Sequence, residues 1–225
     1  MLATVGDHFS VNPYTRWVHD HPATLLPEPT PALLQQKRVA QPLGSGRLIV
    51  ELGSGSGNFL LQHALQFPHD HLVGFELRFK RLVRAARKLE KAGLRRVWLL
   101  REEAQNFADY FAPGSVDRAH LHFPDPWPKF SQWKKRLLTT PFLDRLVTAL
   151  RPGGTLHLKT DHSGYFLHSL SLFRGRPGWR IGGFCNDLHR RAPPAPNLST
   201  EFEQLFVAKH KPIFFLEAVK TGGTG

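Results

Sequence analysis

A glycine-rich turn is the first feature of this sequence that could bind a ligand. The run Val50–Gly57 reads V-E-L-G-S-G-S-G and places Gly53, Gly55 and Gly57 at alternate positions after an apolar segment. Such a turn lets a ligand approach the backbone closely and directs the N–H groups of a following helix at it. The dinucleotide-binding pattern G-x-G-x-x-G needs a glycine where this chain has Asn58, so the turn disfavours a nicotinamide cofactor.

Acidic residues follow each of five predicted strands, and they are Glu51, Glu76, Glu103, Asp125 and Asp161. The carboxyl ends of parallel strands lie along one edge of a sheet, where ligands bind. Carboxylates at that edge suit a cationic ligand with a ribose, and S-adenosylmethionine carries both a sulfonium and a ribose. Each acid alone could instead cap the helix that follows it. Their shared edge is therefore what predicts a cofactor site.

A proline-rich loop after the fourth predicted strand has the composition of a catalytic loop. The run Phe123–Lys129 reads F-P-D-P-W-P-K and contains three prolines, one acid, one aromatic ring and one base. Proline restricts φ, so Asp125 would lose little conformational freedom when a ligand binds. A rigid surface turn with Trp127 packed into the core is the alternative interpretation of the same residues.

The elements that would position these groups follow an alternating pattern. From Arg47 onward, short apolar runs alternate with helix-like stretches, as in parallel strands joined by crossover helices. We expect an α/β fold with a Rossmann-like, doubly wound, mostly parallel seven-stranded sheet and helices on both faces. Its strands are predicted at 48–52, 72–76, 97–100, 117–123, 155–160, 179–184 and 213–219.

Composition limits the classes of function. The chain has 225 residues, with 30 Lys and Arg against 18 Asp and Glu, and the net charge of +12 favours an acidic partner. A single cysteine, Cys185, excludes an intramolecular disulfide scaffold and a Cys-based zinc site. The 13 histidines lack Cys partners and an H-E-x-x-H motif, so we expect no metal. Without a signal-like segment or an apolar run of about 18 residues, we expect a cytoplasmic location and no membrane association.

Basic residues are concentrated in one predicted helix. Arg81, Arg84, Lys88 and Lys91 fall on one side of it, and we call these four residues the basic stripe. The stripe could contact RNA phosphates and release their counterions. A solvated polar face is the alternative, and the sequence leaves the two open.

The chain resembles the bacterial tRNA (guanine-N7)-methyltransferases, which are class I methyltransferases that use S-adenosylmethionine. The resemblance extends from about Leu48 to Lys220. It rests on the specific run Phe123–Lys129, together with Glu51-Leu52-Gly53, Gly74-Phe75-Glu76, Leu150–Asp161 and Thr200–Glu203. It implies methyl transfer to N7 of a guanine in tRNA, at position 46 of the tRNA, in the variable loop. The predicted organisation is then a proline-rich N-terminal arm over 1–45 and a methyltransferase domain over 46–225.

The resemblance also assigns roles to individual residues. Asp125 would be catalytic, and the cofactor would be bound by Glu51, Gly53, Gly55, Gly57, Glu76, Glu103 and Asp125. The guanine and its RNA would be contacted by Lys129, Asp161, Thr200, Glu201, Phe202 and Glu203. Two positions depart from the family pattern: Glu103 stands where the family usually has Asp, and Phe130–Arg136 replaces a run rich in His and Arg.

Two other functions fit the same residues. One is an S-adenosylmethionine-dependent methyltransferase that acts on another nucleic acid or a small substrate. The other is an RNA-binding protein on the same fold that has lost turnover. The five acids at the strand ends (Glu51, Glu76, Glu103, Asp125 and Asp161) and the Phe123–Lys129 run favour an enzyme, because a binding module needs no sulfonium site. The sequence does not distinguish a monomer from a homodimer.

Overall fold

The computed structural model describes residues 25–26, 28–36, 46–190 and 197–222. They form an eight-stranded sheet in the order β1-β4-β3-β2-β5-β6-β8-β7. The strands are β1 (Leu25–Leu26), β2 (Leu48–Leu52), β3 (His71–Phe75), β4 (Val97–Leu100), β5 (Val116–His122), β6 (Leu150–Thr160), β7 (Trp179–Cys185) and β8 (Phe214–Lys220). All pairs are parallel except those of β8, which runs antiparallel to β6 and to β7. The predicted doubly wound sheet is confirmed, with one strand more than expected.

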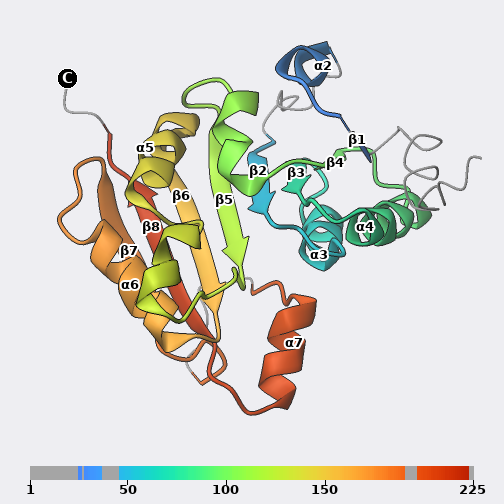
Figure 1. The fold of residues 1–225 in the computed structure, drawn as a ribbon. Coiled ribbons are helices and arrows are strands. Elements are labelled where there is room, and N and C mark those ends of the chain that lie inside the picture. The colour runs from blue at the N-terminus through green and yellow to red at the C-terminus, as the bar shows by residue number, and fades with distance from the viewer. Residues whose placement is uncertain (1–24, 27, 37–45, 191–196, 223–225) are drawn as a thin grey trace, which may run out of the picture.

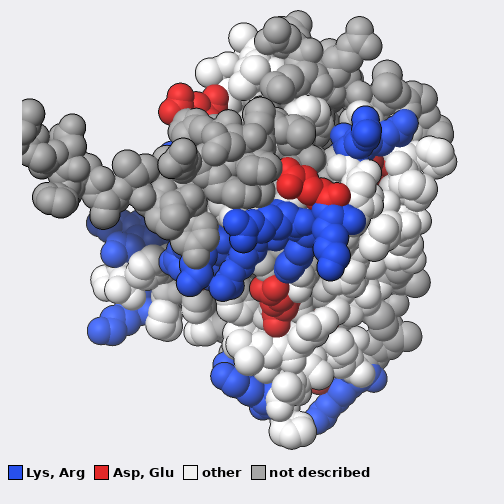
Figure 2. Space-filling view, turned by 90° about the vertical axis from the view of Figure 1, so that its right-hand side faces the viewer, with Lys and Arg blue, Asp and Glu red and all other residues white. Residues whose placement is uncertain are grey.

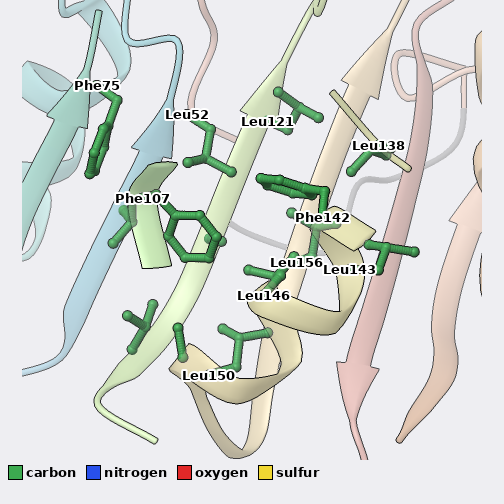
Figure 3. Packing of buried hydrophobic residues seen from close by; sticks show 14 of the residues in the cluster. Leu52, Phe75, Phe107, Leu121, Leu138, Phe142, Leu143, Leu146, Leu150 and Leu156 are labelled. Carbon is green, nitrogen blue, oxygen red and sulfur yellow. The ribbon is translucent and has the colours of Figure 1, made fainter. Parts of the chain in front are cut away.

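Helices cover both faces of this sheet (Figure 1). They are α2 (Pro31–Gln36), α3 (Asn58–Gln66), α4 (Phe79–Lys91), α5 (Thr140–Ala149), α6 (Ser163–Phe173) and α7 (Glu201–Ala208), with 3-10 helices η1 (Ala104–Tyr110) and η2 (Phe130–Lys135). Because side chains alternate along a strand, β2 serves both faces. Its Ile49 packs with α3 and α4, whereas Val50 and Leu52 pack with α5, α6 and η1. Figure 3 shows this second cluster, in which Phe142 of α5 lies over the sheet near Leu52 and Leu121.

The additional strand comes from the N-terminal segment. Leu25 and Leu26 pair with Leu99 and Leu100 of β4, and both leucines are buried. Helix α2 adds Leu34 to the core formed by η1 and α5. These parts of the segment therefore pack with the sheet, while the division at residue 45/46 stays a prediction because most of 1–45 lies outside the described residues.

The edge at which β2, β3 and β5 end is where the strand order reverses. From β2 the chain proceeds outward to β3 and β4, and then returns to β5 on the other side of β2. In open α/β sheets, ligands bind in the crevice at such a point. Within the described ranges, no helix is long and apolar enough to cross a membrane.

Candidate active site

A pocket of about 770 Å³ opens at the carboxyl ends of β2, β3 and β5. This volume is in the range of sites for small molecules and cofactors. Four acids that follow different strands line it, namely Glu51, Glu76, Glu103 and Asp125. Helix α7 lies beyond the strand ends and supplies another wall (Figure 1). The topology thus brings four of the five predicted strand-end acids to one cavity, and the fifth, Asp161, lies outside its lining.

Glu51, at the end of β2, is buried. Its Oε1 shares a hydrogen bond of 2.9 Å with Nδ1 of His122, whereas its Oε2 is buried without a partner among the described residues. Burial raises the pKa of the Glu51 carboxyl well above its usual value, against the opposing effect of the Lys159 ammonium. A cationic group of a ligand placed beside Glu51 would favour its ionised form.

Glu76 ties the glycine turn to the end of β3. Its Oε2 accepts a hydrogen bond of 3.1 Å from the Gly55 N–H, and its Oε1 accepts one of 2.8 Å from the Arg78 N–H. Gly55 has a φ of 56°, in the left-handed region that glycine adopts without strain. A carboxylate offers about four acceptor sites. Glu76 can therefore hold the turn and still accept hydrogen bonds from a ligand in the pocket.

The loop after β5 presents Asp125 in a constrained backbone. Phe123 and Trp127, on either side of Asp125, have φ values of 50° and 39°, which are uncommon for residues other than glycine. Such conformations persist where the surroundings hold them, and they cluster at active sites. The buried Arg136 supplies part of that support, because its Nε donates to the Pro126 carbonyl (2.9 Å) and its Nη2 to the Trp127 carbonyl (3.3 Å).

Helix α7 begins beside the pocket. The Thr200 hydroxyl caps it by accepting from the Glu203 N–H at 3.1 Å, and Thr200, Glu201 and Phe202 line the pocket. The Arg81 guanidinium of α4 lies 5.7 Å from the centre of the Phe202 ring, and Glu201 forms an ion pair of 3.1 Å with Lys88. Helices α4 and α7 are therefore joined across the mouth of the pocket.

Comparisons with known proteins identify the family of this chain. The methyltransferase family model Methyltransf_4 matches residues 45–216. A tRNA (guanine-N7)-methyltransferase of Exiguobacterium sp. is 37% identical over 172 residues, which cover 76% of this chain and 79% of that protein. This chain belongs to the tRNA (guanine-N7)-methyltransferase family. A bifunctional glycosyltransferase/methyltransferase of Fusobacterium nucleatum is 36% identical over 177 residues, and the match covers 78% of this chain but 27% of that longer relative.

A solved structure supports the fold. A 16S rRNA (adenine(1408)-N(1))-methyltransferase from Catenulisporales acidiphilia, determined with its cosubstrate S-adenosylmethionine, aligns with a TM-score of 0.55. The alignment covers 90% of this chain and 96% of that one, at 18% identity. Likeness at this identity shows the fold alone. The Rossmann-like methyltransferase architecture expected for the family is thus confirmed.

Only some of the predicted site residues line the pocket. Those that do are Glu51, Gly53, Gly55, Glu76, Glu103, Asp125, Thr200, Glu201 and Phe202. Gly57 does not line it, and a Cβ at Gly57 would lie 2.8 Å from the Cβ of Ala85, so this glycine lets α3 and α4 pack closely. Lys129 is exposed at the start of η2, outside the pocket lining. Asp161 pairs with Lys211 at 2.8 Å, also outside it.

Glu203 differs most from its predicted role as a guanine contact. It is fully buried, does not line the pocket, and accepts a hydrogen bond of 2.8 Å from the Lys159 ammonium. His189 and Asn197 contact its other oxygen, each at 2.9 Å. Burial alone would raise the pKa of Glu203, but Lys159 and these hydrogen bonds hold that pKa below its usual value. In this structure Glu203 anchors α7 to β6.

Sequence reasoning missed several cations at the pocket. Arg81 and Arg84 of the basic stripe line it, as does Lys135 of η2. Lys88 is held by Asn58, Ser56 and Glu201, so it joins α4 to α3 and α7. Figure 2 shows the Lys and Arg side chains as a band on the side of the molecule where α4 lies. The sequence did contain a signal for these pocket cations: Arg81 and Arg84 lie one helical turn apart, soon after Glu76.

Among the described residues, no group of His, Cys, Asp and Glu is arranged to hold a metal ion. His120 and His122 share one face of β5, because side chains two residues apart along a strand point to the same side, and their rings lie 5.2 Å apart. Both are buried, and burial lowers the pKa of each well below its usual value. They contribute to a separate polar cavity of about 240 Å³ on the α3 face of the sheet.

Proposed function

We propose that this protein transfers the methyl group of S-adenosylmethionine to N7 of a guanine in tRNA, at position 46 of the tRNA, in the variable loop. The observation that carries the proposal is the gathering of Glu51, Glu76 and Asp125 in one pocket beside a glycine turn. Relatives named tRNA (guanine-N7)-methyltransferase match most of the chain. The tRNA partner and a cytoplasmic location belong to the same proposal.

The residues present fit S-adenosylmethionine. The unpartnered Oε2 of Glu51 provides an acceptor for a cationic group of the cofactor. Glu76 has acceptor sites left for the two ribose hydroxyls. No atom lies within 4 Å of where a Cβ would stand on Gly53 or Gly55, so the turn leaves room for a ligand against the backbone. When bound, the cofactor supplies an electrophilic methyl group on a sulfonium.

The chain's own task is alignment and charge stabilisation. N7 of guanine carries a lone pair and no proton, so the enzyme needs no base to create the nucleophile. Positioning of two reactants can lower a barrier by roughly 7–11 kcal/mol. As the methyl group moves, positive charge develops on the purine, and the carboxylate of Asp125 stabilises it from a constrained loop. Thr200 and Phe202 line the pocket on its α7 wall, and we expect them to contact the guanine.

Methyl transfer tests the function directly. Protein is incubated with S-adenosylmethionine labelled in its methyl group and with bulk tRNA, and the RNA is digested to nucleosides. We expect the label in 7-methylguanosine, and sequencing of the modified tRNA to place it in the variable loop. Label in another nucleoside, or binding of the cofactor without any transfer to tRNA, would contradict the proposal.

Arg136 is expected to position the catalytic loop. Replacing it by lysine keeps the positive charge but loses the pair of hydrogen bonds to the Pro126 and Trp127 carbonyls. We expect kcat to fall about 10- to 100-fold, because small displacements of reacting groups have effects of this size. The affinity for S-adenosylmethionine, measured by calorimetry, should change little. Arg145→Lys is the matched control, since Arg145 is partly exposed and pairs with Asp109 away from the loop; equal kcat values for the two folded variants would count against this role.

The basic stripe is expected to contact RNA through its exposed members. Arg84 and Lys91 are exposed, whereas Lys88 is held by Asn58 and Glu201. In Arg84→Gln/Lys91→Gln, the slope of log affinity for tRNA against log salt should flatten by about 1.4 to 1.8, because each of the two lost phosphate contacts removes about 0.7–0.9. Arg174→Gln, on the opposite face of the sheet, should leave the slope unchanged. An unaltered slope in the double variant would assign the stripe to a solvated surface.

A further inference from the structure

The aromatic ring of Phe130 is exposed to solvent just after the loop that carries Asp125. Phe130 of η2 is 81% exposed, more than any other large apolar residue among those described. Its ring packs on Trp133, with 5.0 Å between the ring centroids. Trp133 is supported in turn by His168, at 4.7 Å, and by the Arg136 guanidinium, at 4.2 Å from its ring. The exposed ring is therefore supported from below by a packed layer of side chains.

Three exposed lysines belong to the same short segment as this ring. Lys129, Lys134 and Lys135 are exposed, and none of them has an ion-pair partner within the part of the chain that the structure describes. The Lys135 ammonium lies 4.7 Å from the centre of the Trp127 ring. We call the set the aromatic–basic surface; it consists of Trp127, Lys129, Phe130, Trp133, Lys134 and Lys135.

The aromatic–basic surface is continuous with the pocket. Trp127 and Lys135 line the pocket together with Asp125, and η2 begins directly after the loop that carries Asp125. A molecule whose reacting group lies at Asp125 would therefore extend over Trp127 and Lys135 toward Phe130.

This combination of groups suits unpaired nucleotides. Aromatic rings stack on bases of any sequence, and lysines contact the phosphates that join those bases. A guanine that enters the pocket must leave its own stack, and this exposes a face of the base next to it. The Phe130 ring, held by Trp133, can replace that lost stacking partner with little loss of side-chain freedom on binding.

We propose that Phe130 is a stacking platform for the base adjacent to the target guanine, with Lys134 and Lys135 contacting the neighbouring phosphates. The proposal rests on the proposed function and specifies how the same site receives its RNA. It makes Phe130 a substrate-binding residue outside the cofactor pocket, since the ring does not line that pocket.

Three substitutions of Phe130 separate stacking from simple apolar contact. Phe130→Ala removes the ring, Phe130→Leu keeps apolar volume without a π face, and Phe130→Trp keeps an aromatic ring. We expect KM for tRNA to rise about tenfold in the alanine and leucine variants and to stay near the wild-type value in the tryptophan variant. The kcat value, the cofactor Kd and the melting temperature should change little, because Phe130 is exposed and lies outside the pocket. An unchanged KM for tRNA in Phe130→Ala, or a leucine variant equal to wild type, would overturn the proposal.

Abasic RNA identifies the base that stacks. In tRNA lacking the base on one side of the target guanine, wild-type enzyme should lose about tenfold in kcat/KM, and Phe130→Ala should lose nothing further. Additive losses at both neighbouring positions would contradict stacking on Phe130. If wild-type enzyme forms no 7-methylguanosine, both proposals fail, whereas 7-methylguanosine formation with unchanged variants contradicts the stacking platform alone.

Discussion

Asp125→Ala is expected to lower kcat for methyl transfer to tRNA by about 100- to 1000-fold. Removing one group that stabilises charge developing in a transition state has effects of this size. Asp125 lines the pocket on a loop with uncommon φ values at Phe123 and Trp127, and Arg136 holds the carbonyls of Pro126 and Trp127, so the backbone that carries the Asp125 carboxylate is constrained before the substrate arrives. Cofactor affinity should largely survive, because Glu51 and Glu76 are untouched.

Two further variants identify the contribution of charge. Asp125→Asn keeps the size of the side chain and one carbonyl acceptor, and its kcat should lie between those of the wild type and Asp125→Ala. Asp109→Ala removes an exposed carboxylate outside the pocket and should leave kcat unchanged. The measurements are kcat from labelled methyl transfer at saturating tRNA and cofactor Kd from calorimetry. Normal turnover in Asp125→Ala would refute the catalytic assignment.

Glu76→Ala is expected to weaken S-adenosylmethionine binding about 100-fold. The substitution removes acceptors for the ribose and also the two hydrogen bonds that hold the Gly55 and Arg78 N–H groups. A hydrogen bond to a charged group contributes about 1.5–3 kcal/mol, so the loss of even one such bond to the ligand lowers affinity by tenfold or more. The Arg81 guanidinium, 3.8 Å from Glu76, would also lose its acidic partner at the pocket.

Glu76→Gln separates the two roles of this residue. The amide keeps the shape of the side chain and one acceptor oxygen, so it can keep the hydrogen bond from the Gly55 N–H while the one from the Arg78 N–H is lost. Cofactor affinity should fall by about tenfold through loss of charge. Glu90→Ala, on the exposed side of α4, is the control. Calorimetry gives the cofactor Kd, and melting temperatures without cofactor report whether the turn has loosened. If Glu76→Ala kept wild-type affinity, the ribose would have to bind elsewhere.

Much of the pocket lining could be predicted from the sequence because it depends on local patterns. Glu51, Glu76, Glu103 and Asp125 each follow an apolar run that forms a parallel strand, and parallel strands place their ends at one edge. The glycines and prolines also act locally, since they determine which backbone angles a turn can adopt. Fold class and the strand-end acids are therefore readable from one sequence.

The roles of buried charges could not be predicted in the same way. Glu203 follows Thr200 and Glu201 in the sequence, yet it pairs with Lys159, which lies 44 residues earlier, and so it anchors a helix. Arg136 stands among other basic residues of the same run, and only its burial beneath the Pro126 and Trp127 carbonyls distinguishes it. Strand β1 consists of Leu25 and Leu26 alone, which is too short for a periodic pattern in the sequence. It forms because it pairs with β4.

The sequence by itself determined the class of fold, the edge of the sheet at which the pocket lies and the loop that carries Asp125, because strand alternation and turn residues act over a few neighbours. Only the tertiary structure decided which charged side chains are buried and paired and which face the pocket or solvent. The reason is that the energy of a charge depends on its burial and on partners that are distant in the chain. Glu203 and Phe130 illustrate the two outcomes: a charged residue enclosed by its partners, and an aromatic residue left exposed beside the site.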